Sequence, residues 1–378
     1  MEFIDIVFTE ELQSLQKDVR AFCDREVRPI ARQLDKGMAV PEDLWRKMGA
    51  RGYFGLMAGP EYGGSGAGHL ALAVATEEAS RASGVMYTVI TGQNGAYYDP
   101  ILFYGTQRQK ERYIPGCVRG TLKGAFCLTE PGAGSDAGGM LTTARLEGDH
   151  YVINGEKIFI TNGENADFFV VFCRSQEGPV CLIVDRDTPG VSVSPSEKKM
   201  GLHGIGLNSI AFMDVEVPRE NLVGQAGDGF EAAKASLIKT RMGVAAGALG
   251  MAQEAISQAV AYAKSHTRDG TSLARHQGVQ FLLAECQAKL DAARLLVYRC
   301  AHALDCGRAE TYMASEAKYI GTEFANDIAG KCLEIMGEAG CTDAYAVERI
   351  FRDLKVFEIF DGTTEIHKIL ISKWMGVR

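Results

Sequence analysis

A carboxylate stands directly before a glycine near the end of this sequence, at Asp361 and Gly362, and the run continues with Thr363, Thr364 and Glu365. An Asp-Gly pair is, on residue types alone, an ordinary turn signal. A carboxylate that a tight turn holds in place is also suited to take a proton from a substrate. Asp361 is therefore a candidate general base, and other segments must decide between these two interpretations.

A second segment, residues 128–136, reads LTEPGAGSD and is rich in glycine and hydroxyl groups. Its glycines partly match a dinucleotide-binding fingerprint, but that motif needs a strand leading straight into a helix, and Pro131 interrupts such a path. A glycine-rich surface loop is the ordinary alternative. The functional interpretation is that small residues let the backbone and the hydroxyls of Thr129 and Ser135 approach a flat, polar cofactor.

A third segment, residues 157–163, reads KIFITNG. In a regular strand, Phe159 and Thr161 lie on the same face because side chains alternate with a period of two. The ordinary interpretation is a strand end with one core aromatic residue.

These three segments together make the chain resemble the acyl-CoA dehydrogenases, flavoenzymes that oxidise acyl-CoA thioesters, over nearly its whole length. The resemblance implies an α+β, acyl-CoA dehydrogenase-like fold with an N-terminal helical domain (1–122), a middle β-barrel domain (123–226) and a C-terminal four-helix bundle (227–378). It also implies FAD as cofactor, an acyl-CoA substrate, a homotetramer, and an electron-transferring flavoprotein as electron acceptor.

The resemblance assigns flavin contacts within one chain to ten residues. They are Phe126, Leu128, Thr129, Gly134, Ser135, Phe159, Ile160, Thr161, Thr363 and Glu365. In the family, the aromatic residue at position 159 lies against the flavin ring, and the hydroxyl at position 161 bonds near the N5 atom that receives the hydride. Phenylalanine replaces a frequent tryptophan at 159, which keeps the apolar face and removes an N–H donor.

A further set of flavin contacts comes from a neighbouring subunit in this family, and it maps onto His266, Gln277, Glu334 and Gly337. His266 stands in the place of an arginine, so its contact with the pyrophosphate should be weaker than that of a guanidinium. Glu334 stands in the place of a glutamine, and an acidic side chain facing a pyrophosphate is unfavourable. This set departs furthest from the family pattern.

The same resemblance implies that Arg241, Ser135 and Gly362 seat the thioester end of the substrate. Other family members carry their catalytic carboxylate at the place of Thr240, and threonine cannot be that base. Asp361 is then the remaining candidate among the family's positions. In the family, the main-chain N–H of the base residue polarises the thioester carbonyl while the carboxylate removes the α-proton.

Aspartate replaces the family's usual glutamate at Asp361, and it is shorter by one methylene, about 1.5 Å. A displacement of about 1 Å can cost on the order of a hundredfold in rate, so the substrate must sit closer or differ in shape. Gly92 and Ala96 follow in the helix that begins near Val85, where small residues leave room for the acyl group; tight helix packing is the equal alternative. We expect a branched, cyclic or bulky acyl group.

Helical periodicity begins at Thr9, a candidate N-cap, and extends to about residue 120, and β-prone runs follow Gly124. Long amphipathic helices return after Asp228, with Leu290 and Leu295 among the residues expected on their buried face. Blocks in this order favour an α+β fold over a doubly wound sheet. The β block, with its Asn-Gly turn signals, is expected to form an antiparallel sheet.

Composition narrows the classes of partner. The net charge of −8 disfavours a nucleic-acid partner, and no apolar run approaches the roughly 20 residues of a membrane span. The 10 cysteines form no metal-ligand pattern, so no metal site is expected and a reducing cytoplasm fits best.

Two other functions stay open on the sequence. One is a flavin oxidase of the nitroalkane oxidase type, a relative that uses an aspartate base and needs no CoA; Arg241 and Ser135 weigh against it because they match CoA-ester positions. The other is a flavin-bearing partner subunit without turnover of its own.

Overall fold

The computed structural model describes residues 8–377, and its first helix begins where the sequence places a cap. The Thr9 hydroxyl accepts a hydrogen bond from the Leu12 N–H at the start of α2 (Glu10–Glu26). Two glutamates occupy the first turn, where their negative charges interact favourably with the positive end of the helix dipole. Val19 and Phe22 are buried on one face of this helix. The predicted N-cap is confirmed.

Of the N-terminal helices, α2 and α6 (Val85–Thr91) pack against α5 (Gly68–Ala82), which is buried along nearly its whole length. A short π-helix, η3 (Gly92–Tyr97), directly follows α6, and such wide turns are rare in proteins. The other helices of this part are α3 (Ala31–Asp35), α4 (Glu42–Ala50), α7 (Asp99–Tyr104) and α8 (Gln107–Val118).

The middle of the chain forms one seven-stranded sheet with the order β1-β4-β2-β3-β7-β6, and β5 pairs with β4. Its strands are β1 (Gly124–Cys127), β2 (Thr143–Glu147), β3 (His150–Thr161), β4 (Phe168–Ser175), β5 (Gly178–Asp185), β6 (Val191–Val193) and β7 (Leu207–Pro218). The sheet is mixed, because β1 and β2 both run parallel to β4. The expectation of a purely antiparallel sheet is wrong at these two pairs. Within residues 8–377 no strand pairing joins β6 to β1, so the sheet is curled and open at this edge.

Two Asn-Gly pairs were expected to be turns, and only one of them is. Asn162 adopts a left-handed φ of 65° and leads out of β3. Asn154 lies inside β3, where the register against β7 shifts between Ile153 and Gly155. The pair at 154–155 is therefore part of a bulge within a long strand.

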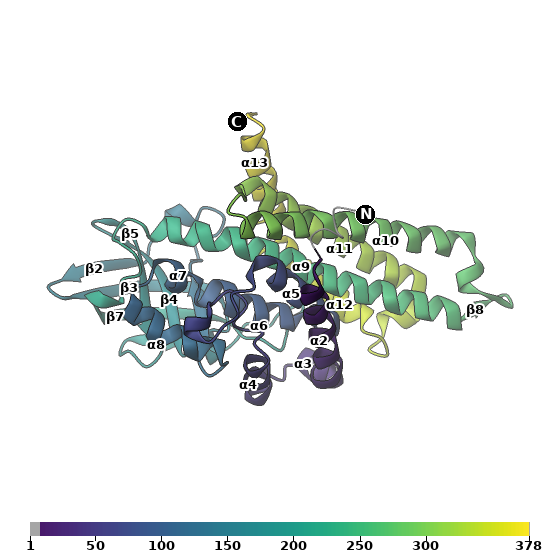
Figure 1. The fold of residues 1–378 in the computed structure, drawn as a ribbon, viewed down its shortest axis with the longest axis horizontal. Helices are drawn as coiled ribbons and strands as arrows, with labels where there is room; N and C mark the ends of the chain where they lie inside the picture. The colour runs from purple at the N-terminus through teal and green to yellow at the C-terminus, as the bar shows by residue number, and fades with distance from the viewer. Residues whose placement is uncertain (1–7, 378) are drawn as a thin grey trace.

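The last part of the chain is a set of long helices in which α9 (Gly229–Ser265) packs against α5, α10 and α11. The remaining helices are α10 (Gln277–Asp305), α11 (Thr311–Met336), α12 (Val347–Lys355) and α13 (Thr364–Trp374). In Figure 1, α9 extends from the sheet along the bundle toward the small hairpin of β8 (Thr267–Arg268) and β9 (Thr271–Ser272). Leu290 is buried in α10 as its spacing suggests, whereas Leu295 is 40% exposed, contrary to that pattern.

No helix of the described residues is both long enough and apolar enough to cross a membrane.

Candidate active site

The candidate base lies in a turn with unusual backbone angles. Asp361 has φ 54° and Gly362 has φ 105°, so two consecutive residues are left-handed. Glycine adopts such a φ freely, but for aspartate it is uncommon and slightly strained. The turn ends at Thr363, whose hydroxyl accepts from the Ile366 N–H at 3.4 Å and caps α13. The turn and the start of the helix together fix the direction of the Asp361 side chain.

Two cations hold the backbone of this turn. Arg241, on α9, donates from Nε to the Asp361 carbonyl oxygen at 3.2 Å, and Lys318, on α11, donates from Nζ to the Gly362 carbonyl oxygen at 2.7 Å. Within residues 8–377, no lysine or arginine nitrogen forms an ion pair with the Asp361 carboxylate. The cations therefore bind the main chain and leave the carboxylate without a salt bridge.

The electrostatics of the site follow from burial. The protein around the Asp361 carboxyl group raises its pKa, and hydrogen bonding from Thr240 together with the charge of Lys318 opposes that rise. Burial lowers the pKa of Lys318 to about 8 and also lowers the pKa of Arg241. His367 is fully buried beside Gly362, and burial lowers its pKa to about 3, so its ring is neutral at ordinary pH.

Three aromatic side chains pack together beside the turn. The Tyr87 ring lies 4.9 Å from that of Phe357 and 5.6 Å from that of Phe360, measured between ring centroids. Tyr87 is buried, and burial, with the nearby Asp361 charge, raises its pKa well above the usual value. The sequence identified the helix that carries Tyr87 but not this residue.

The space beside Gly92 is occupied. A Cβ added to Gly92 would lie 2.7 Å from Tyr97 Cζ, because the π-helix places the two residues together. The expectation of open room at Gly92 is therefore wrong, and tight packing explains this glycine. Ala96 is partly exposed. The Tyr97 hydroxyl is buried and has no hydrogen-bond partner within residues 8–377.

The next turns of the same segment line a narrow crevice, whose other lining residues include Thr240 and Lys239 on α9. Asp99 also lines it, but this carboxylate is already paired with Lys239 at 2.9 Å and accepts from the Ser236 hydroxyl at 2.7 Å. Asp99 is therefore a poor alternative base.

The two predicted flavin segments lie against each other. The Ile158 N–H donates to the Thr129 carbonyl at 2.9 Å. The buried Lys157 ammonium donates to the Leu128 carbonyl at 3.1 Å and to the Glu130 carboxylate at 2.7 Å. These bonds fasten the glycine-rich loop to β3, although the two segments are distant in sequence.

This surface suits a flat cofactor. Phe159 is 59% exposed with φ 55°, at a register shift between Lys157 and Ile160 that interrupts the expected alternation. An exposed aromatic ring held by a strained strand favours stacking on a ligand. A Cβ added to Gly132 or Gly134 would meet no atom within 4 Å, so a ligand can approach the loop backbone.

Other members of the predicted flavin set differ in exposure. Ser135 is exposed and Thr129 and Thr161 are partly exposed, whereas Leu128 and Ile160 are buried in the core. The Phe126 ring packs on the Phe172 ring, with 4.7 Å between centroids, and Glu365 is exposed in the first turn of α13. Leu128, Ile160 and Phe126 can thus offer mainly backbone groups to a cofactor. The residues present fit FAD.

The predicted cross-subunit set lies far from Asp361 in the same chain. His266 directly follows α9, Gln277 begins α10, and Glu334 and Gly337 stand at the end of α11. The 25 residues from Arg241 to His266 along α9 span about 38 Å at 1.5 Å per residue. The structure does not bring this set to its own chain's site.

These distal side chains are nonetheless available to a ligand or a second chain. Gln277, Glu334 and Gly337 are exposed, and the His266 ring stacks on Tyr262 with 3.7 Å between centroids.

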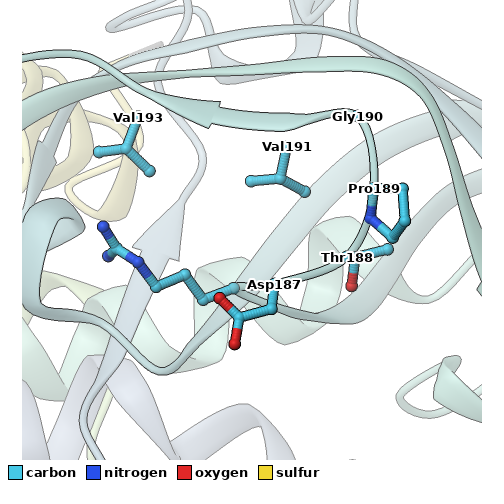
Figure 2. A pocket seen from close by; sticks show the side chains of 7 residues that line it. Asp187, Thr188, Pro189, Gly190, Val191 and Val193 are labelled. Carbon is cyan, nitrogen blue, oxygen red and sulfur yellow. The ribbon is translucent and has the colours of Figure 1, made fainter.

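A separate surface depression lies on the link between β5 and β6 (Figure 2). Arg186 there donates to the Gly163 carbonyl at 3.0 Å and to the Ala166 carbonyl at 3.2 Å. These hydrogen bonds hold the loop that follows β3. No candidate catalytic group lines the depression.

Comparison with known families agrees with this arrangement. The chain matches the acyl-CoA dehydrogenase N-terminal domain over residues 9–121, the middle domain over 125–215 and the C-terminal domain over 227–376. The chain therefore belongs to the acyl-CoA dehydrogenase family. It is an FAD-dependent oxidoreductase with the fold of that family.

Individual relatives cover nearly the whole chain. A 3-(aryl)acrylate reductase of Clostridium sporogenes is 41% identical over 97% of this chain and 98% of its own. The caffeyl-CoA reductase-Etf complex subunit CarC of Acetobacterium woodii is 38% identical over 97% and 98%. An acyl-CoA dehydrogenase of Bacillus anthracis, solved in complex with FAD, superposes with a TM-score of 0.92 at 32% identity, covering 98% of this chain and 67% of that one.

Proposed function

We propose that Asp361 is the base that removes the α-proton of an acyl-CoA thioester as a double bond forms between the α- and β-carbons. The observation that carries this is a carboxylate without a salt bridge whose two adjoining backbone carbonyls are held by Arg241 and Lys318. Burial raises the pKa of Asp361, which strengthens it as a base once it is ionised. Bound FAD supplies the acceptor for the hydride that leaves the β-carbon.

The backbone of the same residue has a second role in this proposal. Within residues 8–377, the Asp361 N–H makes no hydrogen bond, so it can donate to the thioester carbonyl oxygen. That bond stabilises the negative charge that develops on the oxygen as the α-proton leaves. In the opposite direction, the protonated carboxyl group returns the proton to the α-carbon.

We propose that the acyl group is aromatic or similarly bulky. Tyr87 and Phe360 lie beside the base and pack with the fully buried Phe357, and aromatic rings favour offset or edge contacts with another ring. The names of two relatives, an arylacrylate reductase and a caffeyl-CoA reductase, agree with such a group and with reduction as well as oxidation.

The test is anaerobic mixing of the FAD-loaded protein with a panel of CoA thioesters, with the flavin absorbance as readout. A 3-arylpropionyl-CoA should bleach the flavin faster than butyryl-CoA, and the matching 2-enoyl-CoA should reoxidise the reduced enzyme. Bleaching by straight-chain esters alone would remove the aromatic proposal and leave the acyl-CoA activity in place.

The same experiment separates the two rival functions. Steady peroxide formation with a nitroalkane and no response to any CoA ester would identify a flavin oxidase. A protein that holds FAD but responds to neither class of substrate would be a flavin-bearing partner subunit.

We further propose an electron-transferring flavoprotein as redox partner, which the Etf complex named for one relative supports. A homotetramer in the cytoplasm, with domain limits near 122/123 and 226/227, completes the proposal. Its oligomeric part depends on the distal residues at the far end of the bundle, because they need a second chain to reach a flavin.

A further inference from the structure

Lys318 is a fully buried lysine in the first third of α11. Its Nζ donates to a single carbonyl oxygen, that of Gly362, at 2.7 Å. Burying an ammonium group is costly unless compensating groups surround it. A single hydrogen bond to a turn carbonyl offsets little of the free energy that burying this lysine costs. The turn that it binds carries Asp361, so a role in the candidate site would account for the lysine.

The groups that face Lys318 are mainly those of the candidate site. The charges of Asp361, Glu358 and Glu365 favour its charged form, and Arg241 disfavours it. Neutral His367 also lies beside Gly362, so it adds no charge. Within residues 8–377 no carboxylate forms an ion pair with Lys318. Its charge acts on Asp361 through space.

We propose that Lys318 is a positioning residue for proton transfer: it fixes the left-handed Asp361–Gly362 turn through the Gly362 carbonyl, and its charge keeps the partly buried carboxylate ionised. This inference rests on the proposed role of Asp361 as base. Arg241 holds the preceding carbonyl from α9, so the turn is held from two different helices.

A direction of pH dependence follows. Lys318 has a pKa of about 8, so it is charged at neutral pH and loses its charge above that value. Its charge lowers the pKa of Asp361, against burial, which raises it. Removing the charge should therefore raise the pKa of Asp361 further and move the rise in activity to higher pH. At a fixed pH, a carboxyl pKa that is higher by about one lowers the ratio of base to acid about tenfold.

The experiment uses two variants of the FAD-loaded protein. Lys318→Gln keeps a donor for the Gly362 carbonyl and removes the charge; Lys318→Met removes both. The rate of flavin reduction by the best thioester is followed from about pH 5 to about pH 9, with substrate affinity measured at each pH. The control is Lys331→Met on the same helix, because Lys331 pairs with Glu285 and Asp327 away from the site.

Both Lys318 variants should move the ascending limb of the pH profile upward by about one pH unit. Lys318→Met should also lower the rate at the plateau by about tenfold or more, since the turn is then free to move. The control should keep the wild-type profile. If the Met variant does not fold, the displacement of the limb in the Gln variant decides.

An unchanged limb and plateau in folded, FAD-loaded Lys318→Gln would overturn the inference. Asp361→Asn, tested in parallel, separates this failure from failure of the proposed function. Loss of flavin reduction in that variant with no effect at Lys318 leaves the base assignment standing, whereas activity in Asp361→Asn removes the base itself.

Discussion

Among the described residues, the Asp361 carboxylate forms no salt bridge, although two cations lie close to it. The nearby cations donate to the backbone carbonyls of the turn, so within residues 8–377 the carboxylate has no salt bridge that would compete with a substrate proton. A structural aspartate at an ordinary turn would accept from local N–H groups. Its role therefore has a direct test.

In Asp361→Asn, substrate should still bind, because size and turn geometry are kept, while flavin reduction falls by about 10² to 10⁴-fold or more. Rapid-mixing spectroscopy and a separate binding titration measure the two effects. Asp361→Glu is the matched variant: the longer side chain should slow the reaction with a bulky thioester and raise relative activity on straight-chain thioesters. Near-wild-type reduction in the Asn variant would falsify the assignment.

Gly92 shows how the neighbouring residues were misread from the sequence. It suggested open space for an acyl group, but the Tyr97 ring already fills that space. Since a wide turn brings these two residues together, the contact depends on a backbone feature that local residue types do not indicate.

Gly92→Ala should destabilise the protein by about 1 to 3 kcal/mol, because the new methyl group would overlap the Tyr97 ring. Denaturant unfolding measures this, and Tyr97→Leu in the same chain should recover part of the loss. Gly278→Ala is the control, since nothing lies within 4 Å of the Cβ it adds. Equal effects of the two glycine substitutions would contradict the packing explanation.

At the level of elements, the sequence predicted the features that depend on residues close together in the chain. The Thr9 cap, the β runs and the long C-terminal helices are confirmed because caps and periodicity are encoded over a few residues. The parallel pairing of β1 with β4 was missed, since strand partners distant in sequence leave no such signal.

The site shows the same division. The turn at Asp361 was readable, whereas Lys318 and Tyr87 arrive from other helices through tertiary packing. One signal for Lys318 was present: it lies four residues after Ala314 and three before Gly321, on the buried stripe of α11. A lone lysine on an apolar stripe indicates a functional or structural partner.

A second buried charge joins two elements. The Asp353 carboxylate on α12 accepts from the Leu202 N–H at 2.6 Å, which fastens the loop between β6 and β7 to the helical bundle. Burial raises the pKa of Asp353 to about 6, although the nearby Arg349 charge opposes the rise. Because the folded pKa is above the unfolded one, its contribution to stability is complete below about pH 4. That contribution is lost as the pH rises through about 6.

Asp353→Asn should therefore gain stability over the wild type as the pH rises from about 4 to about 7, by up to about 3 kcal/mol. An amide oxygen can still accept from Leu202, so the contact itself is kept. Denaturant midpoints at several pH values measure the difference, and Asp149→Asn, at a fully exposed side chain, is the control. A pH-independent difference would contradict this account.

At the scale of the whole molecule, the base and the distal flavin set are separated by the length of the bundle. His266 and Asp361 cannot serve one flavin within one chain, because about 38 Å of α9 separates His266 from Arg241. In the proposed oligomer, the distal residues of one chain would contact the flavin at the sheet end of another.

Mixing two inactive variants tests this arrangement. One variant is Asp361→Asn, which lacks the base; the other combines His266→Ala with Gln277→Ala, which removes two hydrogen-bonding side chains of the distal set and should weaken FAD binding there. In a mixed oligomer, some sites join the intact base of the second variant to the intact distal end of the first. Activity should therefore return on co-assembly, up to a fraction set by random pairing of chains.

The control is each variant assembled with itself, which should stay inactive or FAD-depleted. Sedimentation of the mixture must also show an oligomer, since a flavin-loaded monomer excludes shared sites outright. If the mixed oligomer forms and no activity returns, each chain completes its own site, and the residues at the end of α9 and α11 serve another purpose. Recovered activity instead makes the oligomer a requirement of the chemistry, because neither chain then holds a complete site.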